Sequence, residues 1–247
     1  MKIPYTDHIS WRKTITEDAM ADISKSNQKR LRSTVASLPD SIKHQILPIS
    51  DELINWFVPL YTSTIESKNN PKVINVAEEI QKKQDAVEYF ILLLIENGER
   101  IGATIFSKRK TFLSIAYRIY PPNWSVTNTP ASPTLYSEYL ICQHAYEEGY
   151  KKLSHGRDRN PYGKNASIGL AIFKLSSGCK PYVGTKEPDV KVLDTDDLTE
   201  DIFIVSHDET KEFLNSGFLI CSRDTEDKYI QVTKYPEQIK VETIYRD

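Results

Sequence analysis

The sequence lacks the cysteine and histidine patterns that build disulfide frameworks and metal sites. Its 247 residues include three cysteines, which lie far apart in the chain and form no C-x-x-C pair. This arrangement argues against a disulfide framework and against a structural zinc site, and it is typical of a reducing compartment. The histidines show no metal-ligand spacing either. We therefore expect a cytoplasmic protein without a metal.

Long apolar runs and an excess of charge of one sign are also absent. The longest apolar run covers about residues 90–95, whereas a membrane-spanning helix needs about 20 apolar residues. The amino-terminal residues are polar and predict no signal peptide. The formal net charge is −2, so the chain has no global basic excess to hold a nucleic acid by counterion release. We expect no membrane span.

What the sequence does contain is an ordinary globular balance, with 39% hydrophobic and 27% charged residues, which is enough for a sizeable core. Apolar periodicity predicts three helices in the first part of the chain, at residues 24–38, from a cap at Ser50 onward, and at residues 73–87. Strands are predicted at residues 89–96, 100–108 and 111–120. Asn97-Gly98 between the first two strands is a strong hairpin signal.

The second half of the chain alternates helices with strands. We expect helices at residues 134–150 and 167–176, and strands at residues 152–155 and 180–183. Antiparallel strands that run into a β-α-β unit predict an α/β fold, in which a mixed central sheet carries helices on both faces.

The composition becomes acidic and polar after residue 184, which predicts a domain boundary. We expect a main domain at residues 1–186, with amino-terminal helices within 24–88 and a sheet core within 89–184. Residues 187–247 are expected to form a small α/β appendage that either folds back on the sheet or forms a dimer surface. Its expected elements are a strand at 202–205, a helix at 209–214 and a hairpin within 218–235.

Three stretches of the sequence resemble a known family. Residues 24–32 read SKSNQKRLR, residues 135–139 read LYSEY and are followed by Ala145, Glu148, Gly149 and Tyr150, and residues 169–181 read GLAIFKLSSGCKP. Together they resemble the GNAT (acyl-CoA N-acyltransferase) superfamily, and more closely its FemAB-like branch of aminoacyl and peptidyl transferases. The resemblance covers about residues 24–184 and rests mainly on the third stretch.

The resemblance implies an enzyme, an N-acyltransferase that moves an acyl or aminoacyl group from an activated donor to a small-molecule or peptide amine. Standard GNAT enzymes bind the coenzyme A pyrophosphate at a glycine-rich loop before a helix, whereas residues 121–133 hold four prolines and no glycine. FemAB-like proteins commonly dispense with that loop, and some use a charged tRNA. The donor is therefore acyl-CoA or aminoacyl-tRNA. The branch usually carries two such domains in tandem, so a chain with room for one leaves a homodimer open.

Lys174 is the first candidate catalytic residue because it lies in the third stretch. A lysine beside the reacting carbonyl stabilises the oxyanion that forms when an amine attacks an ester or thioester; a solvated helix lysine is the other interpretation. His155 ends the strand predicted at residues 152–155, and Asp158 lies in the turn predicted at residues 156–159, near the end where open α/β sheets place ligands. Either residue would accept the proton of the amine. A structural histidine and a charged surface loop are the alternatives.

The remaining candidates are polar or aromatic residues around the same predicted elements. They are Tyr117 and Glu138 for catalysis, and Arg157, Arg159, Tyr136 and Phe173 for binding the donor. A tyrosine would donate a hydrogen bond to a carbonyl oxygen, and an arginine would hold a phosphate or carboxylate. Each residue also has a plainer interpretation, as aromatic packing, an ordinary helix glutamate or a surface charge.

Two function classes remain open at this point. The basic residues of the first helix, Lys25, Lys29, Arg30 and Arg32, would contact phosphates of a tRNA, or would only form a solvated helix face. The alternative to an acyltransferase is a catalytically inactive GNAT-fold module that binds a ligand or partner, with which the glycine-free loop and the acidic tail are compatible.

Overall fold

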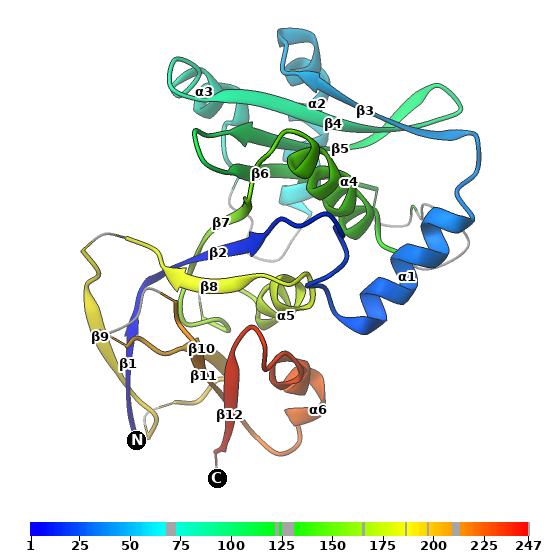
Figure 1. Cartoon of the computed structure of the whole chain (residues 1–247). Helices are drawn as coiled ribbons and strands as arrows, with labels where there is room; N and C mark the ends of the chain where they lie inside the picture. The colour runs from blue at the N-terminus through cyan, green and yellow to red at the C-terminus, as the bar shows by residue number, and fades with distance from the viewer. Residues whose placement is uncertain are drawn as a thin grey trace. The chain divides into compact units, whose positions relative to one another are not determined.

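The computed structural model describes residues 1–67, 73–121, 124, 131–164, 166–185, 187–196, 198–208 and 213–246 (Figure 1). The chain divides into two compact units. The first unit contains Met1–Thr14, Ala21–Lys25 and Ser154–Asp247, and the second contains Ile15–Met20 and Ser26–Leu153. The domain boundary expected after residue 186 falls inside the first unit, and a separate appendage at residues 187–247 stays a prediction.

An antiparallel sheet runs through the second unit. Its strands lie in the order β3 (Ile42–Pro48), β4 (Glu88–Glu96), β5 (Glu99–Lys108) and β6 (Leu113–Ile119). The turn between β4 and β5 places both Asn97, with φ of 52°, and Gly98, with φ of 88°, in the left-handed region. A two-residue turn with positive φ at both positions matches the twist of the flanking strands, and the predicted hairpin is confirmed.

Side chains alternate across this sheet, so each face packs against different helices. Ile91, Ala103 and Ile105 belong to a buried cluster that also holds residues of α2 (Asp51–Glu66) and α3 (Val76–Gln81). On the opposite face, the Thr104 hydroxyl lies 3.3 Å from that of Ser137, and Phe106 packs against His144, both in α4 (Pro133–Glu147). Helices therefore cover both faces of the sheet, as predicted (Figure 1).

The helices begin where short polar side chains cap them. The Ser50 hydroxyl accepts a hydrogen bond from the backbone N–H of Leu53 at the start of α2, as expected. Ser132 caps α4 in the same way, and Pro133 occupies the first helical turn. The basic helix α1 (Lys25–Ala36) forms where it was predicted. α3 is only six residues long, much shorter than the predicted 73–87.

The strands in the described part of the first unit fall into three groups. β2 (His8–Thr14) pairs antiparallel with β8 (Lys180–Val183), and its other neighbour is β7 (Lys152–Arg159). β1 (Lys2–Thr6) pairs antiparallel with β9 (Val190–Asp194). β10 (Ile202–Val205), β11 (Ser216–Cys221) and β12 (Lys240–Tyr245) form a three-stranded sheet. The helix α5 (Ile168–Ser176) packs into the buried cluster of this unit, together with Trp11, Tyr162 and Phe203.

The polar opening segment forms two strands that the sequence did not predict. Ile3, Ile9 and Trp11 are buried, and polar or charged residues separate them along the chain. These few apolar positions are too sparse to stand out as a strand pattern. The segment becomes extended because it pairs with β8 and β9, which come much later in the chain.

The hairpin expected within residues 218–235 is wrong. β11 and β12 pair in parallel, and the chain between them forms α6 (Glu226–Tyr229) and a 3₁₀ helix (Ile230–Lys234). Parallel strands need such a crossover, because a tight turn reverses the chain direction. Val232 of the crossover is fully buried in the cluster of the first unit, and this burial holds the helical connection in place.

Three further expectations concern the connections and the membrane. Residues 209–212 of the expected helix 209–214, and most of the proline-containing loop 121–133, lie outside the described residues. The turn predicted at residues 156–159 is instead part of β7, where Gly156 has a φ of 78° and interrupts the extended conformation. In the part of the chain that the structure describes, no helix is both long and apolar enough to cross a membrane.

Phe203 provides a test of whether the carboxyl-terminal residues fold together with the rest of the first unit. Its side chain is fully buried, and its ring centroid lies 5.9 Å from that of Tyr162. Phe203→Ala leaves a cavity there, so we expect the free energy of unfolding to fall by about 3–5 kcal/mol. Urea unfolding followed by tryptophan fluorescence measures this, because Trp11 is buried in the same cluster.

The control for this variant is Val35→Ala on the exposed surface of α1, which should change stability by less than about 0.5 kcal/mol. A separate early transition for residues 187–247, with the main transition unchanged, would contradict the expectation.

Candidate functional site

Lys174 is directed into the first unit by the spacing of α5. Ile168, Ala171 and Leu175 are buried on one face of this helix. Residues three and four apart share a helix face, so Lys174 follows Ala171 onto the buried side. Its side chain is only 6% exposed. The interpretation as a solvated helix lysine does not fit this burial.

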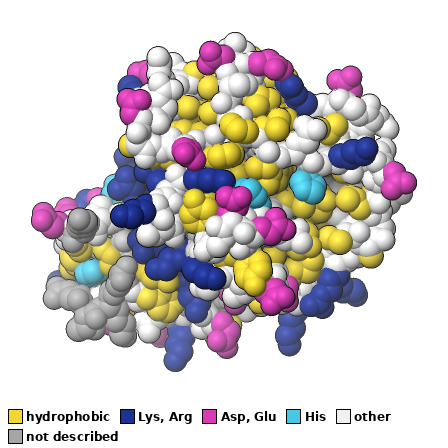
Figure 2. Space-filling view, turned by 45° about the horizontal axis from the view of Figure 1, so that its top comes forward, with side chains coloured by type: hydrophobic (Ala, Val, Ile, Leu, Met, Phe, Trp, Pro, Cys, Tyr) yellow, Lys and Arg dark blue, Asp and Glu magenta, His cyan; other side chains and the backbone are white. Residues whose placement is uncertain are grey.

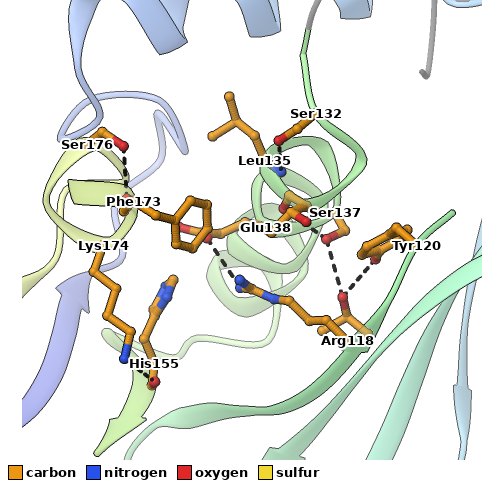
Figure 3. Close-up of polar contacts among 12 residues, drawn as sticks. Arg118, Tyr120, Ser132, Leu135, Ser137, Glu138, His155, Phe173, Lys174 and Ser176 are labelled. Carbon is orange, nitrogen blue, oxygen red and sulfur yellow. Dashed lines mark hydrogen bonds and ion pairs between the residues drawn. The ribbon is translucent and has the colours of Figure 1, made fainter. Parts of the chain in front are cut away.

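The Lys174 ammonium group is held by two residues of β7. Its Nζ atom lies 2.7 Å from each carboxylate oxygen of Asp158. It also donates a hydrogen bond of 3.1 Å to the backbone carbonyl of His155 (Figure 3). The Asp158 side chain is 10% exposed, so the ion pair is largely removed from water. Buried charges of this kind are kept only when they are paired and hydrogen-bonded.

Two aromatic residues extend this ion pair into a buried chain of hydrogen bonds. The Tyr162 hydroxyl donates to Asp158 over 2.6 Å, and the Trp11 indole N–H donates to the Tyr162 oxygen over 2.6 Å. Burial, followed by the neighbouring Asp158 carboxylate, raises the pKa of Tyr162 well above its ordinary value. Tyr162 therefore stays a proton donor to Asp158. No sequence pattern identified Tyr162, because its role depends on contacts with distant residues.

The structure brings four of the predicted site residues together in the first unit. Besides Lys174 and Asp158 they are His155, which is buried, and Phe173, whose ring centroid lies 6.4 Å from that of His155. Arg157 and Arg159 lie on the same strand, with exposed side chains. The first unit thus combines a buried cation, a buried imidazole and two exposed guanidinium groups on β7 and α5.

Glu138 belongs to a separate polar group in the second unit. Its carboxylate is 1% exposed and lies 3.3 Å from the Arg118 guanidinium group (Figure 3). Beside it, the buried Tyr120 hydroxyl is 2.7 Å from that of Thr104, which also contacts Ser137. A Cβ atom at Gly102 would lie 2.4 Å from the Tyr120 ring, so a glycine is needed where that ring crosses β5.

The two predicted tyrosines of the second unit, Tyr117 and Tyr136, pack against other aromatic residues rather than against Glu138. Tyr117 lies on the sheet face that α2 covers, with its ring centroid 5.6 Å from that of Tyr61, whereas Arg118 follows it onto the α4 face with Glu138. Burial raises the pKa of Tyr117 to about 12, so its hydroxyl is protonated at neutral pH. Tyr136 is buried on α4 and stacks on Tyr139, and burial raises its pKa as well.

A cavity of about 450 Å³ opens beside α2 in the second unit. Its lining includes the apolar or aromatic Ile54, Ile80 and Tyr89 and the acidic Asp51 and Glu88. None of the predicted site residues lines it.

The described residues contain no group of three or more histidine, cysteine or acidic side chains that could hold a metal ion. Figure 2 shows charged side chains of both signs interspersed among apolar ones on one face of the molecule.

Comparison with known proteins identifies the fold. No protein-family model and no curated protein matches the sequence. Among solved structures, FemX resembles the chain with a TM-score of 0.53 and 10% sequence identity, over 70% of this chain and 59% of that one. A conserved protein of unknown function from Bacteroides thetaiotaomicron has a TM-score of 0.50 and 12% identity, over 78% of this chain and 61% of that one.

Structural similarity at such low sequence identity establishes the fold alone. This fold is the one that the sequence predicted. The chain has a GNAT-like mixed α/β fold with FemAB-like structural neighbours. It spans less than two thirds of the length of either of these structures.

Removing the charge of Lys174 should destabilise the first unit. Lys174→Met leaves the Asp158 carboxylate buried without its cation, which typically costs about 3–5 kcal/mol. We expect Lys174→Met with Asp158→Asn to recover much of this loss, because no unpaired charge then remains. Urea unfolding of the two single variants and the double variant measures the coupling.

The exposed ion pair between Arg100 and Glu52 provides the control for this cycle. Glu52→Ala should cost less than about 1 kcal/mol. Strictly additive effects of the Lys174 and Asp158 substitutions would mean that the buried pair carries no coupling energy.

The raised pKa of Tyr117 predicts a pH dependence of stability. The pKa of a free tyrosine is about 10, and that of Tyr117 in the folded chain is about 12. Between these values the unfolded chain loses the proton first, so this contribution is fully present below pH 10 and is lost as the pH rises to 12. We expect the wild-type chain to lose stability more steeply across this range than Tyr117→Phe. Equal slopes in urea unfolding at pH 9 to 11.5 would argue against it.

Proposed function

We propose that this chain is an N-acyltransferase that acts in the cytoplasm. It would move an acyl or aminoacyl group from acyl-CoA or aminoacyl-tRNA to the amine of a small molecule or peptide. The observation that carries the proposal is the buried Lys174–Asp158 pair. Lys174 lies in the stretch that resembles the FemAB-like signature, and the fold is like that of FemX.

Acyl transfer to an amine is faster when a hydrogen-bond donor or a positive group lies beside the acyl carbonyl. The acceptor nitrogen attacks the carbonyl carbon and forms the new C–N bond, while the carbonyl oxygen becomes an oxyanion. Collapse of this intermediate breaks the bond to the sulfur of coenzyme A or to the ribose oxygen of tRNA. The Lys174 ammonium group would stabilise the oxyanion, and a fixed charge acts more strongly where water is excluded.

Asp158 and His155 would have different roles, one in positioning Lys174 and the other in accepting a proton. Asp158 accepts hydrogen bonds from Lys174 and Tyr162, so its main role would be to position the lysine. His155 would take the proton that the acceptor nitrogen loses, and the donor's leaving group takes up a proton as it departs. Phe173 packs beside His155 and would help to orient its ring.

The exposed arginines fit the phosphates that both possible donors carry. Arg157 and Arg159 lie next to Asp158 on β7 with exposed side chains, and a guanidinium group binds a phosphate through two parallel hydrogen bonds. In the second unit, Tyr117 and Tyr136 would act only as hydrogen-bond donors, because burial raises the pKa of both. Glu138 would hold Arg118 in place rather than move a proton.

A binding module without chemistry is the second candidate function. The observation that favours it is that the Lys174 ammonium group already contacts both Asp158 oxygens and the His155 carbonyl. An oxyanion would have to replace or share one of these contacts. In the binding module, the ion pair would stabilise the fold alone.

Ligand-dependent thermal stability distinguishes these possibilities first. Acetyl-CoA, free coenzyme A and a nonhydrolysable aminoacyl-adenylate analogue are titrated separately against the purified chain. A ligand at about 100 times its Kd stabilises the native state by about 2.7 kcal/mol. A saturable rise in Tm with coenzyme A species identifies an acyl-CoA donor, and a rise with the aminoacyl analogue alone supports aminoacyl-tRNA. No rise with any of them favours the binding module.

Turnover of the donor then tests Lys174. The variant with both Lys174→Met and Asp158→Asn lacks the cation but leaves no buried charge unpaired. We expect its kcat to fall by about 10²–10³-fold, measured as donor consumed with a panel of primary amines. Lys164→Met on the exposed surface of the same unit is the matched control and should keep full turnover. Full turnover in the folded double variant would remove Lys174 from the mechanism.

A further inference from the structure

The strand β9 has a partner on one side only. It pairs with β1 in a two-stranded ribbon, and no other strand among the described residues extends that ribbon. A strand edge of this kind presents unpaired N–H and C=O groups, which form a template for pairing with another chain.

The register identifies the backbone groups on this open edge. Lys2 faces Asp194 and Ile3 faces Leu193, and the backbone N–H of Thr195 donates to the carbonyl of Met1 over 2.9 Å. Hydrogen-bonded pairs alternate along an antiparallel ladder, so Lys191 and Leu193 turn their backbone groups toward β1. Val190, Val192 and Asp194 turn their N–H and C=O groups the other way, to the open edge.

The opposite edge of the ribbon is already used within the chain. The Pro4 carbonyl accepts a hydrogen bond of 2.8 Å from the backbone N–H of His207. The Thr6 carbonyl accepts one of 3.1 Å from the Asn160 side chain. Both carbonyls point away from β9, in agreement with the alternation. The outer edge of β9 is therefore the side of the ribbon on which a further strand could pair.

Two of the three residues on this edge carry exposed apolar side chains. Val192 is 61% exposed and Val190 is 38% exposed, although valine is a residue that favours paired strands. The only basic residue of the strand is Lys191, which forms an ion pair with Asp7. β9 therefore lacks the lysines or prolines on the open side that commonly protect an edge from pairing.

We propose that two copies of this chain associate antiparallel through β9, in the strand order β1-β9-β9-β1. The two-fold axis passes between the Val192 residues, so that each Val192 faces its counterpart and each Val190 faces Asp194 of the second copy. All of these residues have backbone groups on the open edge, and each facing pair exchanges about two hydrogen bonds. The pairing uses the whole strand and closes at two chains.

Neighbouring registers are less favourable. A shift toward the amino-terminal end places Lys191 directly opposite its counterpart, and like charges in that position destabilise a strand pair. A shift in the other direction places Val192 opposite Asp194 and shortens the overlap. The central register is the one that brings the two exposed valines together without a facing pair of like charges.

The association should be weak and should strengthen with salt. The contact involves one five-residue strand from each copy, so it buries less surface area than the interfaces of permanent dimers. Glu187, Asp189, Asp194 and Asp196 surround the strand in each copy, so the two edges carry charge of the same sign. Salt screens such repulsion between exposed charges. We expect a dimer at high protein concentration that tightens between 0.05 and about 0.5 M salt.

Cross-linking tests the register. In the proposed dimer the two Val192 Cα atoms lie about 5.5 Å apart, within the range of about 4.4–6.8 Å that a disulfide spans. The native Cys142, Cys179 and Cys221 are buried. We expect Val192→Cys to form a disulfide-linked dimer when diamide oxidises the two thiols. In the same dimer each Val190 faces Asp194, so the two Val190 positions are offset by four residues. Val190→Cys should therefore not cross-link. Linking of both variants to the same extent, or of neither, would overturn the proposal.

Sedimentation velocity tests the edge itself, with the full chain over a concentration series. The wild-type chain should shift from monomer toward dimer, and Val192→Pro should stay monomeric, because the lost N–H points away from β1 and the ribbon keeps its own pairing. Val192→Lys should also stay monomeric, since it places like charges opposite each other. Val35→Lys on α1 should behave as wild type. A wild-type chain that is monomeric up to near-millimolar concentration, or a dimer that Val192→Pro does not weaken, would overturn the proposal.

Discussion

The buried ion pair between Lys174 and Asp158 is the interaction on which the first unit depends. A charge that is removed from water must keep its partner and its hydrogen bonds, so this pair fixes α5 against β7. Tyr162 and Trp11 extend the same constraint to β2, because each donates a hydrogen bond along the chain that ends at Asp158. The apolar cluster around these residues then has a defined set of polar contacts at its centre.

The same pair connects stability to the proposed chemistry. An ammonium group that is held by two carboxylate oxygens and a carbonyl has little freedom to move, and a fixed charge costs no reorganisation when an oxyanion forms. Asp158 is better understood as the residue that positions Lys174 than as a base, because its oxygens are already occupied by donors. The signature stretch would then serve the fold and the reaction through one contact.

The second unit is organised by a different rule, the alternation of side chains along strands. Thr104 and Phe106 face α4, whereas Ala103 and Ile105 face α2 and α3. This alternation separates residues that are adjacent in sequence. Tyr117 and Arg118 lie on opposite faces, so the predicted Tyr117 and Glu138 cannot act together on one group within this unit.

The sequence by itself determined the features that depend on local periodicity and turn chemistry, namely the β4–β5 hairpin and the helices on both sheet faces. It also pointed to Lys174 through the family resemblance, and to His155 and Asp158 through their place at the end of a predicted strand. Only the tertiary structure decided which residues surround Lys174, that β11 and β12 run in parallel, and that the polar opening segment forms strands. The physical reason is that these features depend on contacts between residues far apart in the chain: Trp11 meets Tyr162, and β1 meets β9. Such contacts leave no periodic signal in either segment alone.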